Sequence, residues 1–189
     1  MPFDLDKIAR GVRLVLEGLG RDPDEGSLAE TPGRVARAYA EILAGERAEP
    51  EQLIKVFHEE SYDEMVLVRD IPFYSMCEHH LLPFHGRAHV AYIPKAGRIT
   101  GLSKLARVLD AHARRLQVQE RMTADIARTL TKALEPKGVM VVVAAEHLCM
   151  TMRGIKKPGS ISVTSVVTGL FRENPATRAE AMSFIRENR

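Results

Sequence analysis

The stretch MVLVRDIPFYSMCEHHLLPFHGRAHVAYIP, residues 65–94, decides the fold of this chain because it contains two runs of β-branched, aromatic and apolar residues. Residues 65–76 predict one strand and residues 85–94 predict the next. The short segment between them, CEHHLLPF at 77–84, predicts a connection of the hairpin type. Two strands joined in this way pair in the antiparallel sense.

The chain beyond this hairpin supplies further strands and helices. Apolar residues at helical spacing predict helices over 102–115 and 118–134. The runs VMVVVAA at 139–145 and ISVTSVVTG at 161–169 predict two more strands, and a last helix is expected over 175–189. The order ββααββ indicates an α+β protein.

The residues before the hairpin predict a helical segment. Residues 4–19 carry apolar side chains at helical spacing, and Thr31 is expected to cap a helix that runs to about Gly45. Residues 50–58 predict a short third helix. The pattern therefore divides the chain into a helical N-terminal segment, 1–60, and an α+β domain, 61–189.

Composition narrows the class of protein. The 189 residues are 45% hydrophobic and 28% charged, which excludes general disorder. No apolar run reaches the roughly 18–20 residues of a membrane span, and the start lacks the apolar core of a signal peptide, so we expect a cytoplasmic protein without a membrane partner. Residues 71–189 carry a charge balance of +9, which suits a polyanionic ligand such as a nucleotide. Few aromatic residues are available for base stacking, which disfavours a nucleic-acid partner.

Cysteine and histidine spacing indicates a metal site. Cys77 and His80 have C-x-x-H spacing, and His147 and Cys149 stand two apart at the end of a predicted strand, where both are expected to point to one face. Thiolate and imidazole suit Zn²⁺, and two Cys with one His form a catalytic set whose open position holds an acidic water. The alternatives are a closed four-ligand structural zinc, or unrelated polar residues with Cys149 as a small buried hydrophobe.

Other polar residues are candidates for handling a substrate. Histidine is the residue type best suited to proton transfer near neutral pH, which makes His79 and His147 candidates for that role. A structural role explains either histidine equally well, and it is the role we favour for His85 and His89. Lys104, Arg107 and Arg153 carry positive charges that can bind a triphosphate, and Ser103 lies beside the first two at the start of a predicted helix. Glu120, beside Gln119, offers a carboxylate for two adjacent N–H groups such as those of guanine. Singly, each is more often a solvated surface residue.

Four blocks, at 77–94, 101–107, 117–123 and 146–154, resemble the signature blocks of the GTP cyclohydrolase I family in order and spacing, within a likeness that covers about 28–172. The resemblance implies the tunnelling fold, an antiparallel sheet backed by two helices, assembled into a ring that is usually a homodecamer. It also implies conversion of GTP and water to formate and 7,8-dihydroneopterin triphosphate, the first step of folate or pterin synthesis.

The resemblance further implies roles for individual residues. Cys77, His80 and Cys149 match the ligands of one Zn²⁺ per subunit, and His79 and His147 match acid–base histidines. The remaining matches concern the binding of GTP. Glu120 with Gln119 matches the position that recognises guanine, and Ser103 lies by the ribose. The triphosphate contacts are matched by Lys104, Arg107, Arg153 and, in the TPGR motif, Arg34. In this family the active sites lie between subunits.

Other classes of function remain open at this point. A non-catalytic nucleotide-binding module with a structural zinc would explain the same residues. A tunnelling-fold nitrile reductase needs a cysteine free of metal, whereas both cysteines here stand in ligand motifs. A nucleic-acid binder would leave the Cys/His pattern unexplained. Neither a P-loop nor a G-x-G-x-x-G motif occurs, which disfavours a kinase, a GTPase or a Rossmann-fold protein.

Overall fold

The computed structural model describes residues 3–59 and 62–186, which fall into two compact units divided between Ala44 and Gly45. The first unit contains α1 (Leu5–Gly18), a 3₁₀ turn η1 (Gly26–Leu28) and α2 (Thr31–Ile42). The Asp4 carboxylate accepts a hydrogen bond from the Lys7 N–H at 2.8 Å and so caps α1. The prediction that Thr31 caps α2 is wrong by one residue, because Glu30 occupies the cap and Thr31 begins the helix.

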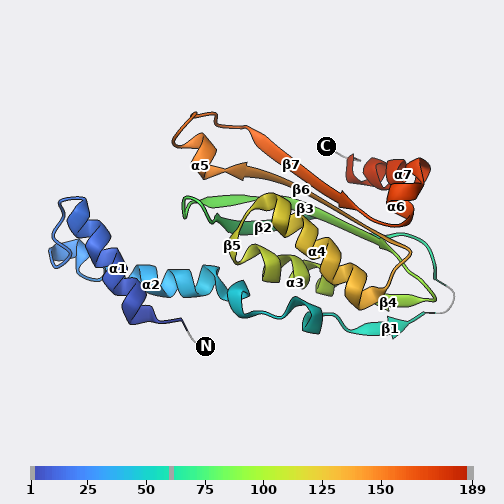
Figure 1. The fold of residues 1–189 in the computed structure, drawn as a ribbon, viewed down its shortest axis with the longest axis horizontal. Helices are drawn as coiled ribbons and strands as arrows, with labels where there is room; N and C mark the ends of the chain where they lie inside the picture. The colour runs from blue at the N-terminus through green and yellow to red at the C-terminus, as the bar shows by residue number, and fades with distance from the viewer. Residues whose placement is uncertain (1–2, 60–61, 187–189) are drawn as a thin grey trace. The chain divides into compact units, whose positions relative to one another are not determined.

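The second unit is built on a five-stranded sheet in the order β5-β2-β3-β6-β7 (Figure 1). Its strands are β2 (Val66–Cys77), β3 (Pro83–Ile93), β5 (Leu116–Gln117), β6 (Gly138–His147) and β7 (Ile161–Val167). The four long strands pair antiparallel, as predicted, whereas β5 pairs parallel with the last two residues of β2. The α+β fold with an antiparallel sheet and a helical N-terminus is therefore confirmed.

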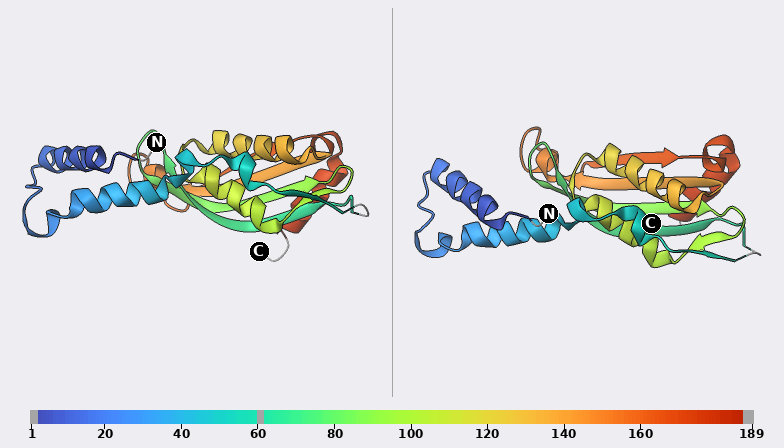
Figure 2. Two further views of the ribbon diagram at one scale, coloured as in Figure 1. Left: turned by 90° about the horizontal axis from the view of Figure 1, so that it is seen from below. Right: turned by 60° about the horizontal axis from the view of Figure 1, so that its bottom comes forward.

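Two helices cover one face of the sheet, as the resemblance implied. They are α3 (Leu102–Ala113) and α4 (Gln119–Leu134), and Figure 2 shows both running along the strands. Alternate strand residues such as Phe84, Val90 and Val141 point to this side and pack in one core with Leu105 and Ile126 of the helices. The core holds the ends of β2 and β6 in fixed positions next to the start of α4.

The other face of the sheet is covered in part by the C-terminal helices. These are α6 (Leu170–Glu173) and α7 (Pro175–Arg186), the part of the predicted helix 175–189 that the structure describes. Phe171 and Ile185 pack with Ala91 and Met140, which point away from α3 and α4 because side chains alternate along a strand. No described helix is long and apolar enough to cross a membrane.

Residues 50–58 do not form the predicted helix. The structure has two short 3₁₀ turns, η2 (Ala44–Arg47) and η3 (Pro50–Leu53), followed by the strand β1 (Val56–His58). β1 pairs antiparallel with β4 (Arg98–Thr100), and this second sheet has two strands. The β-branched Val56 and its distant partner strand determine the conformation there, and a local pattern does not reveal such pairing.

Candidate functional site

The hairpin turn between β2 and β3 positions two of the predicted metal ligands. The Cys77 N–H donates to the Leu82 carbonyl at 2.9 Å, and the Leu81 N–H donates to the Cys77 carbonyl at 2.9 Å. Leu81 takes a left-handed conformation with φ 53°, so the turn is tight. It brings the His80 ring back toward Cys77, with 3.7 Å between Nδ1 and Sγ.

Cys149 completes the group, although from a different element than predicted. β6 ends at His147, and Cys149 lies in the single helical turn α5 (Leu148–Thr151), so the two side chains do not share a strand face as expected. The ligand atoms of Cys77, His80 and Cys149 lie within 4.8 Å of one another.

The three donors fit a tetrahedral metal. Zn–S and Zn–N bonds of about 2.3 and 2.0 Å imply separations of roughly 3.5–3.8 Å between ligand atoms, close to the distance from Cys77 Sγ to His80 Nδ1. Burial raises the pKa of the Cys149 thiol, as does the neighbouring Cys77 sulfur, while Arg153 acts in the opposite direction. A divalent cation between the two sulfurs would favour both thiolates, because it neutralises the charge that opposes their ionisation.

His147 stands two residues before Cys149 in the chain and is fixed on two sides. Its ring stacks on the buried ring of Phe84, with centroids 4.6 Å apart and planes inclined by 3°. Its Nε2 lies 2.7 Å from Oε1 of Gln119. Burial lowers the pKa of His147, and the exposed carboxylate of Glu120 offsets part of this effect. An imidazole and a carboxylate therefore stand together where β6 meets the start of α4.

Gln119 occupies a different setting from Glu120, its neighbour in the sequence. Its side chain is only 2% exposed, and its Nε2 donates to the carbonyls of Val143 and Ser162 and to Oγ1 of Thr164, all within 3.2 Å. Its amide is thus hydrogen-bonded at both ends inside the protein.

His79 is the second predicted acid–base histidine, and it lies in the exposed part of the turn. Its side chain is 64% exposed, and its Nε2 lies 3.7 Å from Glu78 Oε1. The Glu78 carboxylate also pairs with Arg121 of α4, whose Nε donates to Gln117 Oε1 at 3.2 Å. The chain Gln117–Arg121–Glu78 ties the turn to the first residues of α4 and so holds His79 near the candidate metal ligands.

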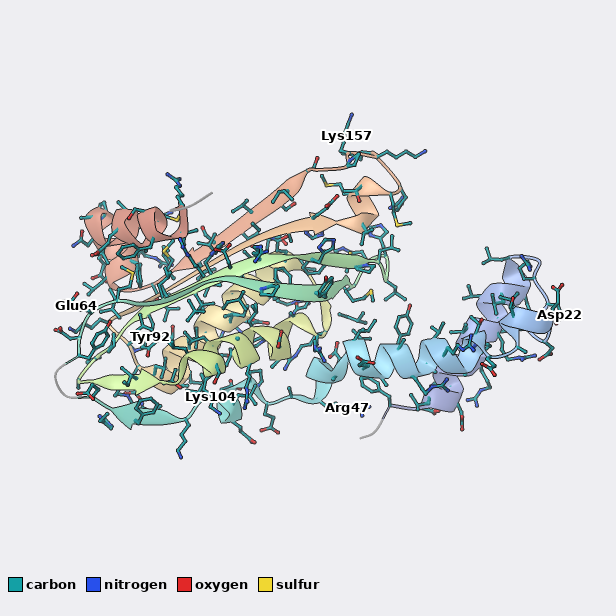
Figure 3. The ribbon with its side chains drawn as sticks, turned by 180° about the vertical axis from the view of Figure 1, so that it is seen from behind. Asp22, Arg47, Glu64, Tyr92, Lys104 and Lys157 are labelled. Carbon is teal, nitrogen blue, oxygen red and sulfur yellow. The ribbon has the colours of Figure 1, made fainter. Side chains whose placement is uncertain are left out.

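The predicted phosphate residues are spread over the chain. Arg153 stands two residues after α5, and its charge acts on the Cys149 thiol. Ser103, Lys104 and Arg107 lie in the first half of α3, whereas the other end of that helix leads to β5 beside Cys77. Figure 3 shows Lys104 far from Lys157, which lies in the loop after α5.

This separation follows from helix geometry. Lys104 stands nine residues before the end of α3, which at 1.5 Å per residue is about 14 Å along the helix axis. Lys104 therefore lies about two and a half helical turns from the end of α3 that leads to Cys77. Arg34 lies in α2 of the first unit, where its guanidinium forms an ion pair with Glu30 one helical turn earlier.

Three residues at the site were not identified from the sequence: Phe84, Thr123 and Thr164. Thr123 Oγ1 donates to the Gln119 carbonyl at 2.7 Å and lies 2.7 Å from Thr164 Oγ1. The Thr123 contact spans four residues of one helix and is a pattern a sequence can suggest. The Phe84 and Thr164 contacts depend on which strands become neighbours.

Comparison with known proteins agrees with this arrangement. Residues 8–186 match a family model described as GTP cyclohydrolase I. Proteins named GTP cyclohydrolase 1 from Pelotomaculum thermopropionicum and Clostridioides difficile are 58% and 59% identical over 184 and 183 residues. The alignment with the Pelotomaculum protein covers 97% of this chain and 98% of that relative. The alignment with the Clostridioides protein covers 96% of this chain and 96% of that relative. A third, from Brevibacillus brevis, is 55% identical over 98% of this chain and 100% of its own length. The chain belongs to the GTP cyclohydrolase I family.

Proposed function

We propose that this chain is a zinc-dependent GTP cyclohydrolase that converts GTP and water to formate and 7,8-dihydroneopterin triphosphate. The observation that carries the proposal is the convergence of Cys77, His80 and Cys149 within 4.8 Å. His147 stands two residues before Cys149, and the Glu120 charge acts on it. A bound Zn²⁺ would supply Lewis acidity and lower the pKa of a water molecule. This chemistry suits hydrolysis at C8 of a purine, a carbon that is poorly electrophilic until N7 is protonated.

The proposed roles of the protein residues follow their positions. Glu120 is exposed at the start of α4, where its carboxylate can accept two N–H groups of guanine and fix the base. His147, about half-buried, and His79, in the exposed turn, are the groups proposed to move protons to and from the opening imidazole and the rearranging ribose. Arg153 is proposed to hold the triphosphate at a set distance from the metal group.

We further propose that a second copy of the chain completes the site. β7 lies at one edge of the sheet, and β5 covers only the last two residues of β2 at the other. Exposed apolar or aromatic side chains lie on these strands, including Tyr74 at 73%, Ile161 at 55% and Val163 at 65%. Open edges of this kind pair with further strands. A ring of copies, taken here as a homodecamer, would let Ser103, Lys104 and Arg107 of one subunit face the metal group of another.

The shared-site proposal has a direct test. Chains with Cys149→Ala and chains with Lys104→Glu are each expected to be inactive as homo-oligomers. If one site uses Cys149 and Lys104 from different chains, random equal mixing leaves about a quarter of the sites with both residues intact. Dissociation and joint reassembly should then restore activity to about that fraction. Mixtures that stay inactive, with mixed oligomers demonstrated by differently tagged chains, would exclude a shared site.

The reaction itself is tested by product analysis. Protein of known metal content is incubated with GTP, and both formate and the fluorescence of the oxidised pterin are measured. The proposal predicts both products, their loss on chelation and their return with added Zn²⁺. Formate without pterin would indicate ring opening without ribose rearrangement. Neither product, with metal and GTP both bound, would favour the alternative of a nucleotide-binding module with a structural zinc.

A further inference from the structure

The hydrogen bonds around Gln119 have a defined direction, because a backbone carbonyl can only accept. Thr123 Oγ1 donates to the Gln119 backbone carbonyl, which can only accept. The Thr123 hydroxyl proton is then used, so at the 2.7 Å contact between the two threonines Thr164 Oγ1 must be the donor. Thr164 Oγ1 in turn accepts from Gln119 Nε2 at 3.1 Å.

Two backbone carbonyls fix the same orientation of the amide. Gln119 Nε2 lies 3.1 Å from the Val143 carbonyl and 3.2 Å from the Ser162 carbonyl, on the neighbouring strands β6 and β7. A flipped amide would set its own oxygen against these two oxygens inside the protein, at the cost of unpaired buried acceptors. The Gln119 Oε1 atom therefore faces His147 and can only accept a hydrogen bond there.

We infer that Gln119 is a positioning residue that fixes the catalytic tautomer of His147, and this inference rests on the proposed function. Because Oε1 accepts, the His147 Nε2 at 2.7 Å must carry a hydrogen. Within the described chain no hydrogen bond is formed by Nδ1, so Nδ1 is the ring nitrogen left open to a substrate. The stacked Phe84 ring fixes the plane of the imidazole, and Gln119 fixes its rotation within that plane.

Gln119 and Glu120 therefore have different roles, although they are neighbours in the sequence. The resemblance groups the two residues as readers of guanine, yet Gln119 has both ends of its amide occupied inside the protein. A reader of the base contributes mainly to the KM for GTP, whereas a residue that orients an acid–base group contributes mainly to kcat. The kinetic split between KM and kcat therefore distinguishes the two roles.

The first test is spectroscopic and needs no turnover. Nitrogen-15 spectra of histidine-labelled protein report which ring nitrogen carries hydrogen, with the His147 signals assigned by their loss in His147→Asn. We expect the Nε2–H form for neutral His147 in the wild-type chain and a mixture of tautomers in Gln119→Met. An Nδ1–H tautomer in the wild-type chain would overturn the inference, whatever the enzyme does with GTP.

The second test is kinetic, with a control on the same helix. Since positioned proton transfer contributes about 10²–10⁴-fold, Gln119→Met is expected to lower kcat by on the order of 10²-fold with little change in KM. The matched control is Thr129→Val on α4, which removes a buried hydroxyl 2.9 Å from Nε2 of a histidine outside the site, His112. The control should retain kcat. A Gln119→Met enzyme with unchanged kcat, or with a raised KM alone, would refute the positioning role.

Discussion

His112 gives the stability of this protein a defined dependence on pH. The residue is 5% exposed on α3, its Nε2 lies 2.9 Å from Thr129 Oγ1, and its Nδ1 has no hydrogen-bond partner in the described chain. Burial, followed by the nearby Arg115 charge, lowers its pKa from 6.5 to about 4. The folded chain therefore keeps His112 neutral at pH values where the unfolded chain protonates it.

The sign and size of the effect follow from this difference. Below pH 6.5 the unfolded state binds a proton that the folded state does not, so the free energy of unfolding decreases until the folded pKa near 4 is passed. At 1.36 kcal/mol per pKa unit the full loss is on the order of 3 kcal/mol, and about 2 kcal/mol of it is present at pH 5 relative to pH 7.5.

The assay is urea unfolding followed by circular dichroism between pH 5 and 7.5, at one fixed protein concentration because assembly contributes to stability. His112→Gln keeps an amide near the position of Nε2 and removes the titrating ring. The variant is expected to be less stable at pH 7.5, yet to lose about 2 kcal/mol less than the wild-type chain on moving to pH 5. Equal losses in the two proteins would refute the buried neutral histidine.

Three further predictions test the guanine contact, the core and one turn. Glu120→Gln should lose the preference for GTP over ATP in competition assays while the metal content stays unchanged, because an NH2 donor replaces one of the two carboxylate oxygens that would accept the guanine N–H groups. Leu130→Ala, at a fully buried position of α4, should lower the free energy of unfolding in urea by about 2–5 kcal/mol. Gly169→Ala should lower the midpoint of thermal unfolding, because φ is 50° there and a Cβ would lie 2.0 Å from the Lys137 carbonyl oxygen.

The long elements could be predicted from the sequence because each carries its own periodic pattern. The strands around 65–94 and the helices α3 and α4 have enough residues for the apolar spacing to be decisive. The two residues of β5 and the three of β1 exist only because partner strands lie beside them. No local pattern distinguishes such short segments from a loop or a helical turn.

The candidate site could also be predicted only where nearby residues in the sequence form it. C-x-x-H spacing within one turn identified Cys77 and His80, since the chain itself brings them together. The strand pattern did not reveal the helical turn that carries Cys149, although the residue does join the group. The setting of Gln119 depends on β6 and β7 meeting at the start of α4, which a sequence pattern does not contain.

The most direct measurement is the metal content and formate production of three proteins: the wild-type chain, Cys149→Ala and the control Met152→Ala, a 60% exposed side chain in the same segment. A catalytic site of this kind predicts about one Zn²⁺ per chain in the wild type and in Met152→Ala, with formate released from GTP by both. Cys149→Ala should lose the metal and the activity together. A Cys149→Ala protein that releases formate without bound metal would contradict the account.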